Sequence, residues 1–249
     1  MRILFSEELH KYHCPELPNL NFISVSTIIG KYHEKFDREA KAISSSKKTG
    51  KSKEQLLQEW DEANKVAVER GTKFHLSQEE ALLKKKNVIK YDTDPSSNLK
   101  MSFDITQLKP GIYPELILYD LEHGIVGTAD YVEIFPDKTF ILEDYKTNKE
   151  LSFSGFKVFD PSTNTRKEKK MYSPLTHLAD CNGIHYSLQL SIYAYMLERA
   201  GYNLRPNGLT VHHILFDENN NPVDRVLYPI NYLKKEVKSL FSHYLKSKK

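Results

Sequence analysis

The sequence contains little cysteine, and its two copies, Cys14 and Cys181, are too few for a disulfide framework or a four-cysteine metal cluster. No apolar run approaches the length of a transmembrane helix, about 18 residues, and no signal peptide opens the chain. A strong excess of one charge is also missing, because the formal net charge is only +3, which is compatible with a nucleic-acid partner without indicating one. These absences predict a soluble, cytoplasmic protein that does not bind a membrane.

The chain has the composition of an ordinary globular protein. Its 249 residues, 39% hydrophobic and 28% charged, can bury a sizeable core in one large domain or two small ones. We interpret residues 1–249 as a single domain. Residues 1–52 are predicted to form an N-terminal β element, with a strand over 23–29, followed by a basic linker. Residues 53–249 are predicted to form a core that ends in a hairpin and a helix.

Hydrophobic periodicity predicts a helix over 53–86, which Gly71 divides or bends, and a second helix over 184–201. The polar stretch 91–109 is typical of an exposed connection. Segments rich in β-branched and aromatic residues predict strands before and after the second helix. This order of elements predicts an α/β fold with a central mixed β-sheet flanked by helices.

The central stretch of the sequence, residues 124–149, is typical of a β-hairpin that turns at residues 136–138. With this three-residue loop, Asp130 lies directly opposite Asp144, and directly opposed residues share a face of the sheet. A two-residue loop would put them on opposite faces. Lys146 shares the face of Asp144 because side chains alternate along a strand.

Two carboxylates that share a face suit a hard divalent cation, which would offset their repulsion and lower the pKa of a bound water. A lysine two residues along the strand could hold that water and offset phosphate charge. The alternative is a surface hairpin with ordinary solvated charges.

Further polar residues fall at positions from which they could join this site. His75 and Glu79 lie four residues apart and hence on one face of the first predicted helix, as a metal site, its surroundings or a surface pair. Glu115 starts the strand before the hairpin and faces either the cluster or solvent. Gln189 and Tyr193 lie one turn apart on the second predicted helix and either point at the site or belong to the core.

A basic segment follows the hairpin, in a stretch over 150–183 that we expect to be irregular. Arg166, Lys167, Lys169 and Lys170 lie there among several aromatic residues. Cations interleaved with rings suit phosphate neutralisation and base stacking, so we interpret these four residues as DNA-binding. The alternative is an ordinary solvated surface.

Four motifs occur in a fixed order along the chain: GTKFH at 71–75 with Glu79 after it, GTAD at 127–130, EDYKT at 143–147, and a Gln-x3-Tyr pattern at 189–193. In order and approximate spacing they resemble the PD-(D/E)XK nuclease superfamily, in its RecB-like exonuclease branch, and small phage-encoded nucleases in particular. The resemblance implies a restriction-endonuclease-like core.

The resemblance also implies roles for individual residues. Asp130 and Asp144 would ligate Mg²⁺ or Mn²⁺, with His75 as an additional ligand. The backbone carbonyl of Tyr145 would complete the inner sphere, and Lys146 would position the attacking water. Supporting positions would be held by Glu79, Glu115, Gln189 and Tyr193.

We therefore expect a metal-dependent DNA nuclease, an exonuclease, acting on single- or double-stranded ends in the cytoplasm of a bacterial or phage-infected cell. Two alternatives stay open, a structure- or site-specific endonuclease and a DNA-binding recombination or replication accessory protein without catalysis. Iron–sulfur members of this branch use four cysteines, so the two cysteines of this chain predict no cluster. Any recombination or replication partner would be a separate chain.

Overall fold

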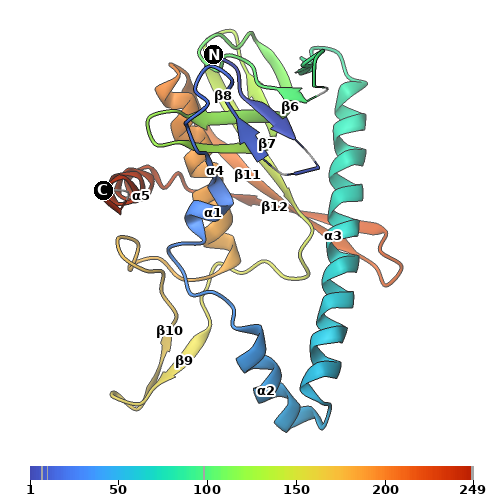
Figure 1. Cartoon of the computed structure of the whole chain (residues 1–249), viewed down its shortest axis with the longest axis vertical. Helices are drawn as coiled ribbons and strands as arrows, with labels where there is room; N and C mark the ends of the chain where they lie inside the picture. Colours follow the sequence, from blue (N-terminus) through green and yellow to red (C-terminus); the bar gives the residue numbers. More distant parts are fainter. Residues whose placement is uncertain (7, 10, 98, 248–249) are drawn as a thin grey trace.

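The computed structural model describes residues 1–6, 8–9, 11–97 and 99–247. A six-stranded mixed sheet forms the centre of the molecule (Figure 1). Its strands are β3 (Ile23–Ser24), β6 (Gly111–Asp120), β7 (Ile125–Ile134), β8 (Thr139–Lys146), β11 (Asn203–Phe216) and β12 (Pro222–Pro229). The path is β12-β11-β8-β7-β3, and β6 pairs with the other edge of β7. The predicted α/β class and mixed central sheet are confirmed.

The hairpin of β7 and β8 has the predicted register. Tyr131 pairs with Glu143, and the N–H of Phe135 donates to the carbonyl of Thr139 at 2.9 Å, so the loop holds three residues. Lys138 ends this loop at φ +60°, the left-handed position that three-residue hairpin loops use before the second strand.

Helix α4 (Asn182–Arg199) connects β8 to β11, which run parallel. A parallel pair needs a crossover connection, and α4 supplies it. Leu188 and Ile192 of α4 belong to the same buried cluster as Val132 of β7 and Leu142 of β8. The main core therefore lies between α4 and the sheet face that carries Val132 and Leu142.

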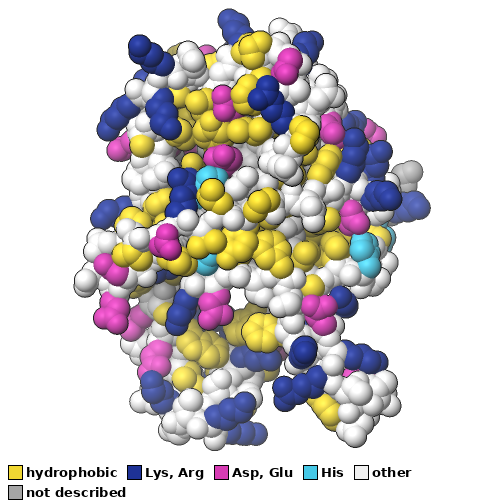
Figure 2. Space-filling view, turned by 180° about the vertical axis from the view of Figure 1, so that it is seen from behind, with side chains coloured by type: hydrophobic (Ala, Val, Ile, Leu, Met, Phe, Trp, Pro, Cys, Tyr) yellow, Lys and Arg dark blue, Asp and Glu magenta, His cyan; other side chains and the backbone are white. Residues whose placement is uncertain are grey.

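The other helices are α1 (Val25–Ile29), α2 (Arg38–Thr49), α3 (Lys53–Leu83) and α5 (Lys234–Ser247). A small sheet in the order β2-β1-β5-β4 is formed by β1 (Leu4–Ser6), β2 (Lys11–His13), β4 (Asp92–Thr93) and β5 (Lys100–Met101), and a separate hairpin by β9 (Lys157–Asp160) and β10 (Thr165–Glu168). Helix α3 runs along one side of the molecule, while α2 and the β9–β10 hairpin project beyond the central sheet (Figure 1). Figure 2 shows two separate lobes at this end, with lysine and arginine side chains on both.

The N-terminal segment corrects two predictions. Only β3 of the strand expected over 23–29 is extended, because the side chain of Ser24 accepts the N–H of Thr27 and starts α1. The expected basic linker contains α2, whose first turn is capped by Asp37 and whose end is formed by Gly50 at φ +73°. Asp at the N-cap and Gly in the left-handed region are standard helix boundaries, and both signals are visible in the sequence.

Two further predictions are corrected downstream. Helix α3 is continuous through Gly71, where an added Cβ would lie 3.1 Å from Thr147 Oγ1, so the glycine allows close approach to the end of β8 rather than a break. The expected irregular segment contains the β9–β10 hairpin. The predicted C-terminal helix is confirmed as α5, while residues 248–249 lie outside the described residues. None of the described helices combines the length and apolar character of a membrane span.

Candidate metal centre

The candidate site lies where the central sheet divides. Along one edge of β7, Ile125 and Val126 pair with β3, and pairing with β8 begins only at Tyr131. At the fork the N–H of Tyr145 donates to Asp130 Oδ2 at 2.7 Å. Extending the β7–β8 register by one position beyond the Tyr131–Glu143 pair sets Asp130 opposite Asp144. The side chain of Asp130 therefore accepts a hydrogen bond from the backbone of the neighbouring strand at the point where the two strands separate.

Two more elements bring ligand-type groups to Asp130. His75 of α3 places its Nδ1 3.4 Å from Asp130 Oδ2. Glu115 of β6 lies opposite Asp130 in the β6–β7 register, with its backbone at φ +50°. One ligand atom each from His75, Glu115 and Asp130 lies within 4.8 Å of the others. A non-glycine residue in the left-handed region carries strain, and such strain is concentrated at functional sites.

Asp144 is only 1% exposed and interacts electrostatically with Asp130 and His75, although it is not itself one of the three converging ligand groups. Its Oδ2 pairs with Lys146 Nζ at 2.6 Å, whereas its Oδ1 has no hydrogen-bond partner among the described residues. The Lys146 ammonium also lies over the ring of Tyr186, 4.6 Å from its centroid. Buried carboxylate oxygens without hydrogen-bond partners are costly, and a cation would satisfy them.

The charged groups of the site shift one another's pKa values. Burial raises the pKa of Glu115 to about 7, and the charge of Asp130 adds to this shift. Burial likewise raises the pKa of Asp144 to about 6, although Lys146 opposes it. Burial alone would lower the pKa of His75, but Asp130, Glu115 and Asp144 outweigh it and raise this pKa to about 8. The site thus concentrates negative charge that is only partly compensated.

Lys146 keeps its proton. Burial lowers the pKa of an ammonium, but Asp144 and Asp130 outweigh this effect and raise the pKa of Lys146 above its ordinary value. Asp130 shows the reverse, because the attraction of His75 and Lys146 and the N–H of Tyr145 overcome its burial and lower its pKa. At neutral pH the two groups are therefore an ammonium and a carboxylate.

Two clefts flank His75. The larger has a volume of about 680 Å³ and is lined by polar groups of several elements, among them Tyr12, Glu79, Lys100, Glu115, Thr128, Gln189 and Tyr193. The smaller, of about 300 Å³, is lined by Lys146, Thr147, Asn148 and Tyr186. Gly71 and His75 line both clefts, so α3 passes across the site between them. Both clefts reach His75, and neither is lined by Asp130 or Asp144.

Helix α4 contributes the predicted polar pair. Gln189 Nε2 donates to Tyr193 Oη at 3.4 Å, and both residues line the larger cleft. An added Cβ on Gly127 would lie 2.6 Å from Tyr193 Oη. The glycine of the GTAD motif is therefore required for Tyr193 to occupy its position, which connects two of the four motifs physically.

Glu79 has an ion-pair partner that the sequence did not indicate. Glu79 Oε1 lies 3.6 Å from the ammonium of Lys100, which is 7% exposed and lies over the ring of Tyr91. Lys100 belongs to the polar stretch that we expected to be an exposed connection, and no local pattern distinguishes it from a solvated lysine. Tyr12, whose hydroxyl lies 2.9 Å from Thr128 Oγ1, was likewise not predicted as a site residue.

The predicted DNA-binding residues lie on the projecting β9–β10 hairpin and just after it. Lys167 contacts Asp160 at 2.8 Å, Lys170 contacts Glu168 at 2.6 Å, and Arg166 is exposed. Lys169 contacts two carboxylates, as described below. None of these four lines either cleft beside His75, so the structure does not bring them to the metal centre itself.

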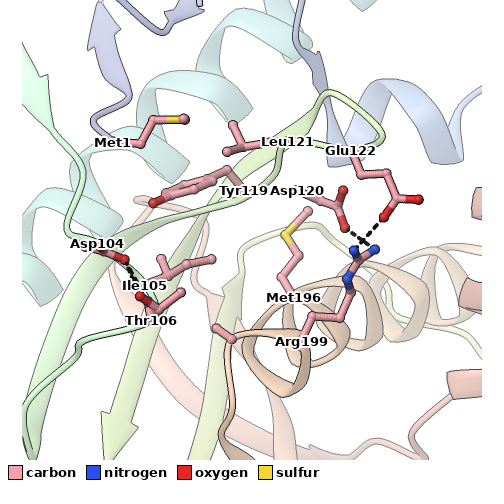
Figure 3. A pocket seen from close by; sticks show the side chains of 11 residues that line it. Met1, Asp104, Ile105, Thr106, Tyr119, Asp120, Leu121, Glu122, Met196 and Arg199 are labelled. Carbon is pink, nitrogen blue, oxygen red and sulfur yellow. Dashed lines mark hydrogen bonds and ion pairs between the residues drawn. The ribbon is translucent and has the colours of Figure 1, made fainter. Parts of the chain in front are cut away.

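A cavity of about 350 Å³ at the C-terminal end of β6 provides a contrast (Figure 3). There Arg199 contacts Asp120 at 2.9 Å and Glu122 at 2.6 Å, and Asp120 also contacts His123 at 2.8 Å. These carboxylates are compensated by an arginine, whereas those around His75 face one another. The arrangement around His75 is the better cation site.

No protein-family model matches the chain, and no curated protein matches it.

Proposed function

We propose that this protein is a metal-dependent deoxyribonuclease of the PD-(D/E)XK type, acting as an exonuclease. The observation that carries the proposal is the convergence of His75, Glu115 and Asp130 on one point, directly beside the buried Asp144–Lys146 pair. These groups come from four separate elements, and they are the groups that the resemblance implies. The proposal includes a restriction-endonuclease-like core, supported by the order β6-β7-β8-β11 with α4 as the crossover.

The residues of the site fit a hard divalent cation. Carboxylate oxygens are the preferred ligands of Mg²⁺ and Mn²⁺, and the site offers those of Glu115, Asp130 and Asp144 with one imidazole. Asp144 pairs one oxygen with Lys146, and its other buried oxygen, Oδ1, has no hydrogen-bond partner among the described residues and is free to receive a cation. We propose His75, Glu115 and Asp130 as the inner ligands, with Asp144 and the carbonyl of Tyr145 completing the set. The cation, when bound, supplies neutralisation of phosphate charge and a water of lowered pKa.

The other residues act on the substrate and the water. Hydrolysis forms a bond between the water oxygen and phosphorus and breaks the bond from phosphorus to the leaving sugar oxygen, while the water loses a proton and the leaving oxygen gains one. Lys146 carries an ammonium in the metal-free site, from which it can donate hydrogen bonds to the water or to a phosphate oxygen. Gln189 and Tyr193 present an amide and a hydroxyl to the larger cleft, where they can hold the nucleic-acid strand.

We propose that the β9–β10 hairpin contacts the DNA backbone at a distance from the metal centre. Lys167 and Lys170 already contact carboxylates on the same hairpin, and these surface pairs can be exchanged for phosphates at little cost because exposed ion pairs contribute only about 0–1 kcal/mol. Contacts of this kind make binding depend on salt.

The proposal is tested by digesting end-labelled linear DNA, single- and double-stranded, beside a closed circle, with Mn²⁺, with Mg²⁺ and with EDTA. We expect metal-dependent loss of the linear strands while the circle is spared. Nicking of the circle would make the protein an endonuclease. Binding without cleavage under either metal would leave a DNA-binding accessory protein.

A variant pair assigns any cleavage to this site. Lys146→Met should keep metal and DNA binding while cleavage collapses, because it removes the ammonium and keeps an unbranched side chain of similar length. Lys149→Met, three residues along in an exposed position, is the matched control and should cleave like the wild type. Full activity of Lys146→Met would remove this residue from the mechanism.

A further inference from the structure

A second cluster of ligand-type side chains lies apart from the metal centre. His33 follows α1, Asp180 precedes α4, and His185 lies in the first turn of α4. One ligand atom of each residue lies within 4.8 Å of the others. Asp180 Oδ1 is 3.1 Å from His185 Nε2 and 3.9 Å from His33 Nδ1. The two imidazole rings are stacked, with their centroids 4.2 Å apart.

The two carboxylate oxygens of Asp180 have different surroundings. Oδ2 lies 3.1 Å from the Lys169 ammonium, and this ammonium also lies 2.9 Å from Glu34. Glu34 therefore compensates the charge of Lys169, and Oδ1 remains directed at the imidazoles. Asp180 is only 8% exposed, so its carboxylate is held in the interior between Lys169 and the imidazole of His185.

The three side chains are of the kinds that hold metal ions. A neutral imidazole is the commonest metal-binding side chain, and a carboxylate is a frequent third partner.

We propose that His33, Asp180 and His185 hold a Zn²⁺ ion at a site that is separate from the nuclease centre. Two imidazoles and a carboxylate are established zinc donors at about 2.0–2.2 Å, and a water would complete the tetrahedron. His33 Nδ1 now lies 3.1 Å from the backbone carbonyl oxygen of Glu34, so binding of the ion would require this ring to turn away from that carbonyl.

The position of the cluster defines what the ion would do. A cleft of about 590 Å³, lined in part by Glu34, Lys169, Asp180 and Cys181, gives access to it from solvent. The ion would join the connection between α1 and α2 to the start of α4. One backbone hydrogen bond already links the same regions, from the N–H of Tyr172 to the carbonyl of Tyr32 at 2.6 Å. Zinc would therefore fix the base of the projecting α2 (Figure 1).

The experiment measures zinc binding in the full chain, with the nuclease centre disabled by Asp130→Asn and His75→Asn so that this centre does not contribute to the zinc bound. After dialysis against Zn²⁺ and removal of excess ion, we expect about one equivalent of zinc by elemental analysis, and visible absorption bands of a four-coordinate ion when Co²⁺ replaces it. Adding His33→Asn or His185→Asn should weaken Zn²⁺ binding by about tenfold or more and remove the Co²⁺ bands.

His177→Asn is the matched control. His177 lies 3.0 Å from the single carboxylate of Glu236, so it offers a histidine–carboxylate pair without a third ligand. This variant should bind zinc like its background. Absence of zinc from the background protein, or equal binding by the His33, His185 and His177 variants, would overturn the proposal. If His185→Asn unfolds, as circular dichroism would show, His33→Asn in the connecting segment still decides the question. No readout involves DNA cleavage, so failure here is distinct from failure of the proposed nuclease function.

Discussion

Glu115 is the residue of the metal centre that we expect to destabilise the metal-free protein most clearly. Its carboxylate lies within the group formed with His75 and Asp130, on a backbone at φ +50°. Burial and the charge of Asp130 raise its pKa from 4.5 to about 7. The substitution Glu115→Gln keeps the size and shape of the side chain and removes the charge.

The sign and size of the effect follow from this pKa. Because the folded value lies above the unfolded one, the wild-type protein loses stability as the pH rises from about 4.5 through 7, and the loss is complete above that range. At 1.36 kcal/mol for each pKa unit, the upper limit is about 3 kcal/mol. The glutamate also attracts protonated His75, and its removal forfeits that attraction, so we expect Glu115→Gln to stabilise the metal-free protein by about 1–3 kcal/mol near pH 8.

Urea unfolding in EDTA at about pH 5 and pH 8 measures this difference. The variant should be more stable than the wild type at the higher pH and close to it at the lower. Excess Mn²⁺ should reverse the order, because the ion stabilises only a protein that binds it. Glu218→Gln, in the exposed turn after β11, is the control and should change nothing. Equal stability of Glu115→Gln and wild type near pH 8 in EDTA would refute the reasoning.

Three further predictions concern neighbouring features. The affinity for Mn²⁺, measured by calorimetry, should rise with pH up to about 8, because the ion must displace the proton of His75, and His75→Ala should flatten this dependence. Gly127→Ala should reduce the cleavage rate strongly and destabilise the fold by about 1–3 kcal/mol, since its Cβ would lie 2.6 Å from Tyr193 Oη; normal kinetics would show that Tyr193 can move without consequence. Leu142→Ala should cost about 2–5 kcal/mol in urea unfolding, because Leu142 is fully buried between α4 and the sheet, and a smaller loss would indicate that the core collapses around the cavity.

The part of the site carried by the hairpin could be predicted because its geometry is local. The length of the loop after Phe135 determines the pairing register, and the register determines that Asp130 and Asp144 oppose each other. Side-chain alternation then places Lys146 on the same face. None of these steps needs information from distant parts of the chain.

The rest of the site depends on tertiary contacts that no local pattern encodes. Glu115 joins the group through the β6–β7 register and an unusual backbone conformation, whereas its sequence neighbourhood is equally typical of a solvent-facing strand residue. Lys100 is buried because Glu79 of α3 lies across from it, and its polar surroundings in the sequence predicted exposure. The position of Gly71 shows the same limit, since its role is the close approach of α3 to Thr147 and not a break in the helix.

Asp130 has both a structural and a chemical role at the point where β7 and β8 separate. Asp130 lies where β7 separates from β8. Its side chain accepts the N–H of Tyr145, the residue directly after Asp144. The same Oδ2 atom lies 3.4 Å from His75 of α3. One carboxylate therefore sets the spacing of the two strands and the distance of the helix, so the positions of the proposed ligands cannot vary independently. Loss of its charge removes a ligand, whereas loss of the whole side chain also leaves a backbone donor without its partner at the point where the sheet divides. The proposed ligands are thus positioned by side-chain and tertiary contacts at the point where the backbone pairing of β7 and β8 ends.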